Sequence, residues 1–212
     1  MRKGGRESKA DYIYKQEFSH LLAALMPENR LALEVSLATG LRISDVLNMR
    51  TDKLAQRMSV VELKTGKRRA IRLPAELLDR LVAISGKIFV FPGRLDPRRP
   101  RTRQAVYKDL RRAATLFRIP EIRGLHLSPH SARKIFAVSE YQKSGSLAKV
   151  KKLLNHSDEA VTILYALADT ITARNHPGWK PTQEAAPKCR CGPAARMAPT
   201  AAASRQAGAD KV

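Results

Sequence analysis

The stretch SVVELKTGKRRAIRLP, residues 59–74, contains two runs of strand-forming residues on either side of Thr65 and Gly66. Two short runs of this kind around a glycine-containing turn are typical of a β-hairpin. We therefore predict an antiparallel hairpin here, with Lys64 and Lys67 at its tip.

Outside the hairpin, apolar residues recur mostly at helical spacing. In residues 15–25, Phe18, Leu21 and Leu25 fall on one face of a helix. The run KIFVFPG, residues 87–93, instead predicts a short buried strand. The fold class expected is α+β, mainly helical with one small antiparallel β-sheet. Further helices are predicted over residues 30–40, 42–49, 74–84, 104–117, 128–145, 147–156 and 159–169.

The composition indicates a polyanionic partner. Among 212 residues, 40 are Lys or Arg and 19 are Asp or Glu, which gives a formal net charge of +21. An excess of this size favours nucleic acid as the partner, although a generally basic proteome or RNA packing, as in ribosomal proteins, would give the same charge. The chain has no apolar run of about 20 residues that could span a bilayer, and its basic N-terminus lacks the apolar stretch of a signal peptide.

The amino-acid composition of the sequence changes near His176. We expect one catalytic domain over residues 1–175, followed by an Ala/Pro-rich, disordered basic tail over residues 176–212. The only cysteines, Cys189 and Cys191, lie in this tail. Their spacing suits neither a disulfide nor a complete zinc site, so a reducing cytoplasm is expected.

Several polar residues are candidates for a site, although each also has an ordinary structural explanation. His130 and Arg133 are three residues apart on a predicted helix and could converge on one anion, but such pairs are usually solvated. Arg42 follows the glycine turn at Gly40 and begins a helix. Asp45 could brace its guanidinium, or the two could form a plain surface pair.

The same ambiguity applies to the hairpin tip and to the last predicted helix. Lys64 and Lys67 could contact a phosphate backbone, and a mobile lysine could protonate a leaving alkoxide, yet hairpin-tip lysines are usually only solvated. His156 precedes Tyr165 by nine residues. Because Tyr165 stands among apolar residues such as Leu164, it would be taken alone for a packed helix aromatic.

In this order and spacing, the candidates resemble the catalytic set of the tyrosine recombinases, the phage-integrase and Xer-like family. The resemblance covers roughly residues 14–170 and implies the catalytic-core fold of these DNA breaking-rejoining enzymes. It also implies a site-specific recombinase or integrase that uses neither metal nor ATP. The matching segments are ATGLRISDVLNMR (38–50), VVELKTGKRRAIRLP (60–74), SPHSARKIFA (128–137) and LLNHSDEAVTILYA (153–166).

The resemblance implies that Tyr165 is the nucleophile, which attacks a DNA phosphodiester and forms a 3′-phosphotyrosyl link. Arg42 and Arg133 then clamp the non-bridging oxygens of the phosphate, as two fixed guanidinium forks can. No carboxylate cluster suited to Mg²⁺ is evident in the sequence, and no metal or other cofactor is expected.

Three further residues complete the implied set. Lys64 is the general acid for the 5′-oxygen, preferred to Lys67 because it is the first lysine of the hairpin motif. His130 helps to accept the tyrosine proton, and His156 hydrogen-bonds the scissile phosphate.

The implied partners are double-stranded DNA, further copies of the chain in a homotetramer, and in some reactions an accessory DNA-binding protein. The enzyme would act in the cytoplasm on nucleoid DNA of bacterial, phage or mobile-element origin. Backbone contacts are expected from the hairpin and the basic loop that follows residue 93, through Lys67, Arg68, Arg98, Arg99, Arg101 and Arg103.

The sequence departs from the family pattern at a few places. Lys134 stands where a histidine is common, and Asn155 stands where a glycine is common. Only 41 residues precede Arg42, so we expect a catalytic domain without the usual core-binding domain, as in the fimbrial phase-switch invertases. Residues 167–175 could pack on a neighbouring protomer or form a plain C-terminal helix.

Two other functions fit the same features. One is a non-catalytic DNA-binding accessory or regulatory protein on this scaffold, against which stands the complete set of six residues. The other is a type IB topoisomerase-like activity, which shares the tyrosine chemistry but would relax supercoiled DNA without sequence preference.

Overall fold

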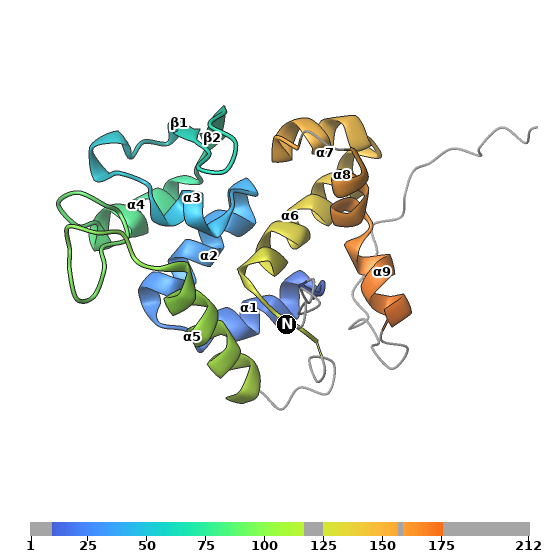
Figure 1. Cartoon of the computed structure of the whole chain (residues 1–212), viewed down its shortest axis with the longest axis horizontal. Helices are drawn as coiled ribbons and strands as arrows, with labels where there is room; N and C mark the ends of the chain where they lie inside the picture. The colour runs from blue at the N-terminus through green and yellow to red at the C-terminus, as the bar shows by residue number, and fades with distance from the viewer. Residues whose placement is uncertain (1–9, 117–124, 157–158, 176–212) are drawn as a thin grey trace, which may run out of the picture.

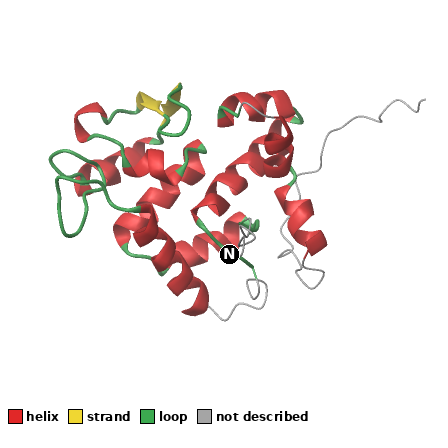
Figure 2. Ribbon diagram, in the orientation of Figure 1, coloured by secondary structure: helices red, strands yellow, loops and turns green. Residues whose placement is uncertain are grey.

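A computed structural model describes residues 10–116, 125–156 and 159–175. The described part is mainly helical and carries one two-stranded sheet, so the predicted fold class is confirmed (Figures 1 and 2). The predicted tail, with both cysteines, lies outside the described residues. No helix in the described ranges is long and apolar enough to cross a membrane. The elements are α1 (Lys15–Ala23), α2 (Pro27–Thr39), α3 (Ile43–Leu47), the 3₁₀ turn η1 (Thr51–Lys53), β1 (Arg57–Val61), β2 (Arg68–Arg72), α4 (Ala75–Ile84), α5 (Arg103–Leu116), α6 (Pro129–Ser144), α7 (Leu147–Leu154), α8 (Glu159–Ala166) and α9 (Ala168–Asn175).

The hairpin forms where the sequence predicts it. Strands β1 and β2 pair antiparallel, with Val61 opposite Arg68 and Met58 opposite Ile71. At the turn, the Gly66 amide donates to the Glu62 carbonyl at 2.8 Å, and Gly66 has a positive φ of 67°. A glycine adopts this conformation at little cost, so the turn holds the two strands in register.

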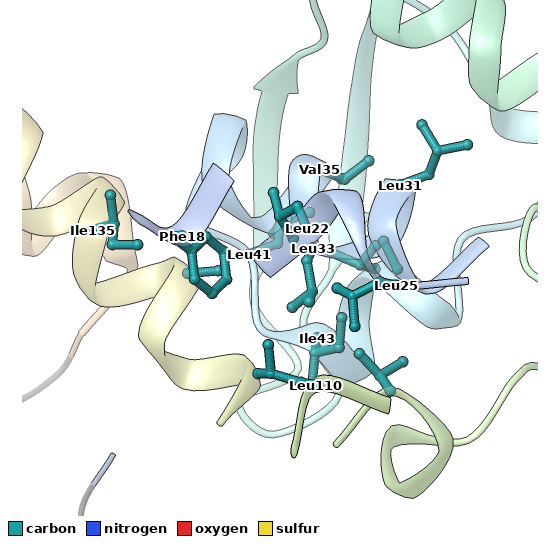
Figure 3. Close-up of a cluster of buried hydrophobic side chains, with 14 of the residues drawn as sticks. Phe18, Leu22, Leu25, Leu31, Leu33, Val35, Leu41, Ile43, Leu110 and Ile135 are labelled. Carbon is teal, nitrogen blue, oxygen red and sulfur yellow. The ribbon is translucent and has the colours of Figure 1, made fainter. Parts of the chain in front are cut away.

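The main core gathers apolar side chains from helices that are far apart in the sequence. Figure 3 shows Phe18 and Leu22 of α1 beside Leu33 of α2, with Leu110 of α5 and Ile135 of α6 in the same cluster. Full burial of a side chain of this size contributes about 1.5–3 kcal/mol relative to exposure. The core therefore fixes α2, which ends shortly before Arg42, and α6, which carries His130 and Arg133.

The turn from α2 to α3 is built on Gly40. Gly40 ends α2 in the left-handed conformation, with φ 68°, and its amide donates to the Ser36 carbonyl at 2.8 Å. A methyl group at this position would overlap the ring of Phe136 on α6. The missing side chain thus lets α6 lie directly against the turn. Arg133 of α6 therefore lies next to the turn that leads into Arg42.

The C-terminal helices pack on α6. Figure 1 shows α7 above one end of α6, α8 beside that end, and α9 below α8. Ala168 of α9 is buried in the main core, and Thr172 accepts a hydrogen bond from the Tyr12 amide at 2.9 Å. Residues 168–175 thus form a helix that contacts its own chain through Ala168 and Thr172.

The predicted strand at residues 87–93 is wrong. Val90 and Phe91 are fully buried as expected, but this segment makes only isolated bridges, Arg50 to Phe89 and Pro92 to Pro100. Proline has no amide hydrogen to continue a ladder. A run of apolar residues therefore crosses the core here without becoming a strand.

Candidate active site

A cavity of about 350 Å³ opens between the hairpin and the helices α3, α6 and α8. Of the six residues predicted to be catalytic, five line it: Arg42, Lys64, His130, His156 and Tyr165. The sixth, Arg133, is 1% exposed and is hydrogen-bonded to His156 of the lining. The fold therefore brings together residues that lie 123 positions apart in the sequence, from 42 to 165.

Arg133 is held mainly by the main chain. Its Nη1 donates to the Gly40 carbonyl at 2.6 Å, and its Nη2 donates to the Leu154 carbonyl at 2.7 Å. Burial, together with the charge of Arg42, lowers the pKa of Arg133 to about 10. The guanidinium is thus still charged at neutral pH and is fixed between α2 and α7.

Arg42 is held by a carboxylate. It occupies the N-cap position of α3, and its Nη1 donates to Glu62 Oε2 at 2.5 Å. The predicted pairing with Asp45 is wrong, because the Asp45 Oδ1 atom accepts instead from the Leu63 amide at 2.9 Å. Asp45 thus supports the start of the hairpin turn, and burial raises its pKa.

His130 and Tyr165 face each other. The Tyr165 hydroxyl lies 3.5 Å from His130 Nδ1, and the α6 N-terminus that carries His130 is fixed by a capping box between Ser128 and Ser131. Burial, followed by the charge of Arg133, lowers the pKa of His130. Burial raises the pKa of Tyr165, although Arg133 and Arg42 act in the opposite direction. At neutral pH a neutral imidazole therefore stands beside a neutral phenol, with room for the contact to shorten when a substrate is bound.

His156 bridges Arg133 and α8. Its Nε2 lies 3.0 Å from Arg133 Nη2, and its Nδ1 lies 3.2 Å from Thr162 Oγ1. A guanidinium can only donate, so Nε2 accepts and the ring proton is on Nδ1. Burial and then Arg133 lower the pKa of His156 to about 4, so the ring is neutral. It meets the ring of Tyr165 edge to face, with centroids 5.2 Å apart.

The departure at Asn155 has a structural reason. Asn155 ends α7 in the left-handed conformation with φ 54°. Asparagine is the residue other than glycine that adopts this conformation most readily. It therefore makes the turn that delivers His156 to the cavity.

The residues predicted to contact DNA divide into two groups. Lys67, Arg68, Arg98 and Arg99 are exposed, and Arg103, also exposed, lines the cavity. Arg101 has a structural place instead, because its side chain is 9% exposed and its Nε donates to Asn29 Oδ1 at 2.6 Å. We therefore remove Arg101 from the set of DNA contacts.

Sequence reasoning missed three residues that shape the site. Glu62 holds Arg42, Thr162 contacts His156, and Arg69 donates to the carbonyls of the Thr39–Gly40 turn. The alternation of β2 signals Arg69, because it shares a strand face with the buried Ile71. Among the described residues, no group of three or more His, Cys, Asp or Glu side chains is placed to hold a metal ion.

Comparisons with known proteins agree on one family. The sequence model of the phage integrase family matches residues 11–170. The chain is 26% identical to the integrase of Escherichia phage P2 over 156 residues, which cover 73% of this chain and 42% of that protein. It is 30% identical to the tyrosine recombinase XerC of Pseudomonas aeruginosa over 166 residues, which cover 68% of this chain and 50% of XerC. The chain thus spans about half the length of these relatives.

Two solved structures give the same fold. The XerH site-specific recombinase, bound to its difH substrate in a pre-cleavage complex, superposes with a TM-score of 0.60 at 20% identity, covering 74% of this chain and 51% of XerH. The catalytic domain of bacteriophage HP1 integrase superposes with a TM-score of 0.55 at 20% identity, covering 82% of this chain and 97% of that domain. The fold expected from the sequence motifs is confirmed.

Proposed function

The chain belongs to the phage integrase family, and from this membership we propose that it is a site-specific DNA recombinase that cuts and rejoins DNA through Tyr165. The observation that carries the proposal is the cavity itself. The Tyr165 hydroxyl meets His130 at 3.5 Å in a space lined by Arg42, Lys64 and His156. A nucleophile, a base and cations around one space suit attack on a phosphodiester.

In the proposed reaction the Tyr165 oxygen attacks the phosphorus of a DNA strand. The bond between phosphorus and tyrosine oxygen forms as the bond to the 5′-oxygen breaks, leaving a 3′-phosphotyrosyl link. His130 accepts the tyrosine proton, which its lowered pKa permits because the imidazole is neutral at neutral pH. Lys64 gives a proton to the departing 5′-oxygen, and a 5′-hydroxyl reverses these steps to rejoin a strand.

The two arginines stabilise the charge that gathers on the phosphoryl oxygens. Arg42 lies in the cavity wall, and Arg133 stands behind His156, fixed by carbonyl groups before any substrate arrives. Donors that are already in place need no reorganisation in the transition state. His156 contributes by donating to a phosphoryl oxygen, once its Nε2 is released from Arg133 and the ring proton has moved from Nδ1 to Nε2.

Double-stranded DNA is the proposed substrate. The formal net charge of +21 suits it, and the XerH structure and a λ integrase dimer are bound to DNA substrate and core-site DNA respectively. We propose that four copies act together on two duplexes of bacterial, phage or mobile-element origin, with an accessory protein where the reaction needs one. Backbone contacts would come from Lys67, Arg68, Arg98, Arg99 and Arg103.

The test is covalent trapping on DNA. A pool of nicked suicide duplexes, randomised around the nick, is incubated with the chain and with Tyr165→Phe, and the adducts are separated under denaturing conditions. We expect adducts with the native chain alone. Binding without adducts would contradict the proposal and favour a non-catalytic DNA-binding protein. Relaxation of supercoiled plasmid without sequence preference would favour a topoisomerase.

A further inference from the structure

Glu62 is a buried carboxylate at the edge of the proposed catalytic site, and it has no role in the reaction described above. Its side chain is 0% exposed, whereas that of its partner Arg42 is 16% exposed. The carboxylate contacts the Arg42 guanidinium at 2.5 Å through Oε2. Among the described residues, Glu62 is the only acceptor within hydrogen-bonding distance of that guanidinium, so it sets where Arg42 points.

The same carboxylate also holds the turn that carries Lys64. Thr65 Oγ1 donates to Glu62 Oε2 at 3.0 Å. The Glu62 main chain contributes as well, since its carbonyl accepts from Gly66 at 2.8 Å and its amide donates to the Lys67 carbonyl at 3.0 Å. Lys64 lies between these anchors, two residues from Glu62 and one from Thr65. One oxygen atom thus joins Arg42 to the hairpin tip.

Glu62 also offsets a concentration of positive charge. Arg42, Arg69 and Arg133 lie close enough that the charge of Arg42 lowers the pKa of each of the other two, while that of Glu62 raises both. The second oxygen, Oε1, is buried and has no hydrogen-bond partner among the described residues. A buried carboxylate with one oxygen unpaired is costly unless cations surround it, and here they do.

We propose that Glu62 is a positioning residue for DNA cleavage, which fixes Arg42 and the Lys64 turn to each other while its charge weakens the hold of the cavity on the phosphate. The inference rests on the proposed function. It has an unusual consequence: without the charge of Glu62, a phosphate should bind more tightly and yet be cleaved more slowly.

The experiment uses Glu62→Gln, which keeps the size of the side chain and removes its charge. The matched control is Glu34→Gln, because Glu34 is also in ion pairs, with Arg30 and Arg80 at 2.7 Å, but does not line the cavity. Affinity for inorganic phosphate is measured by titration calorimetry or NMR. Single-turnover cleavage is measured on the suicide duplex recovered by trapping.

For Glu62→Gln we expect phosphate affinity to rise about three- to tenfold, from the loss of one negative charge several ångströms away. We expect cleavage to slow about tenfold, because a neutral amide oxygen holds Arg42 and Thr65 more weakly than the carboxylate does. Glu34→Gln should change neither. Cleavage by Glu62→Gln at the native rate would overturn the inference. So would a variant in which phosphate affinity, cleavage rate and melting temperature all fall, because that would indicate general damage to the fold.

Thr65→Val provides a second test that does not depend on folding of the charge variant. It removes the hydroxyl bonded to Glu62 Oε2 from an exposed residue and leaves the ion pair with Arg42 intact. Cleavage should slow about threefold, as expected when one hydrogen bond is lost, with unchanged phosphate affinity. Cleavage at the native rate would count against a link through Thr65. If the native chain itself forms no adduct, the proposed function fails. The phosphate titration would still test whether the charge of Glu62 weakens phosphate binding.

Discussion

The two arginines proposed to stabilise the phosphate, Arg42 and Arg133, are held by different parts of the molecule. On the helical side, Arg133 is fixed by the carbonyl groups of Gly40 and Leu154. On the hairpin side, Arg42 is fixed by the side chain of Glu62. Main-chain carbonyls stay wherever the fold is kept, whereas a carboxylate can be changed by one substitution. The helical side is therefore a property of the fold, and the hairpin side depends on this particular sequence.

The largest effect is expected from Arg133→Ala. Cleavage should fall about a thousandfold, because a preorganised donor is lost. The free energy of unfolding should fall by about 3 kcal/mol, because the Leu154 carbonyl loses the hydrogen bond from Arg133 and the Gly40 carbonyl keeps only the longer one from Arg69. Single-turnover trapping and chemical denaturation measure the two losses.

Arg42→Ala is the counterpart on the hairpin side. It should also lose stability, but here because Glu62 keeps a buried charge without its partner. Adding Glu62→Gln should therefore restore stability to Arg42→Ala and not to Arg133→Ala. If Glu62→Gln changed the stability of both arginine variants equally, Arg42 would not depend on Glu62 in the way proposed.

Lys64→Ala should slow cleavage about a hundredfold, the usual range for loss of a general acid. A substrate with sulfur in place of the 5′-bridging oxygen should restore the rate, because a thiolate leaves without a proton. Lys67→Ala is the matched control, since Lys67 is exposed on the same turn and should weaken DNA binding without any rescue by sulfur. Absence of rescue for Lys64→Ala would remove Lys64 from the role of acid.

Gly40→Ala tests how firmly the helical side is built. The new methyl group would overlap the Phe136 ring and stand at φ 68°, so we expect a loss of about 2 kcal/mol or more in the free energy of unfolding. Gly66 has nearly the same φ, 67°, but a Cβ added there would have no atom within 4 Å. Gly66→Ala should therefore lose only about 1 kcal/mol in the free energy of unfolding. If denaturation gave equal losses in the free energy of unfolding for the two variants, α6 would have to shift easily to make room for the methyl group.

The smallest effect concerns His130. Its lowered pKa means that the imidazole accepts a proton at neutral pH and loses this ability as the pH falls through that pKa, below 6.5. The single-turnover rate should therefore be level around neutrality and fall in acid. His130→Gln should slow cleavage less than Lys64→Ala does, because water can accept the tyrosine proton in place of the imidazole, and it should remove the acid limb of the pH–rate profile. A profile unchanged in this variant would assign the limb to another group.

The sequence predicted the two sides of the cavity to different extents. Helical periodicity and the turn at Gly40 predicted the helices that hold Arg133, and the residues around Thr65–Gly66 predicted the hairpin. The partner of Arg42 was predicted wrongly, because Asp45 is near it in the sequence and Glu62 is near it only after the hairpin folds back. Local spacing can suggest a neighbour within one helix but not across two elements.

The same limit explains Arg101. Its place in a basic loop predicted a DNA contact, but Asn29 and Glu28, far away in the sequence, take its guanidinium. Charge patterns predict where a chain is basic, while only the packed structure tells which charges remain exposed.

The central claim is that the cavity exists to let Tyr165 attack DNA. The most direct measurement is to digest the adduct trapped on the suicide duplex and identify the linked residue and DNA end by mass spectrometry and sequencing. The account predicts Tyr165 joined to a 3′-phosphate at one recurring sequence. A link to another residue, or to a 5′-phosphate, would contradict it.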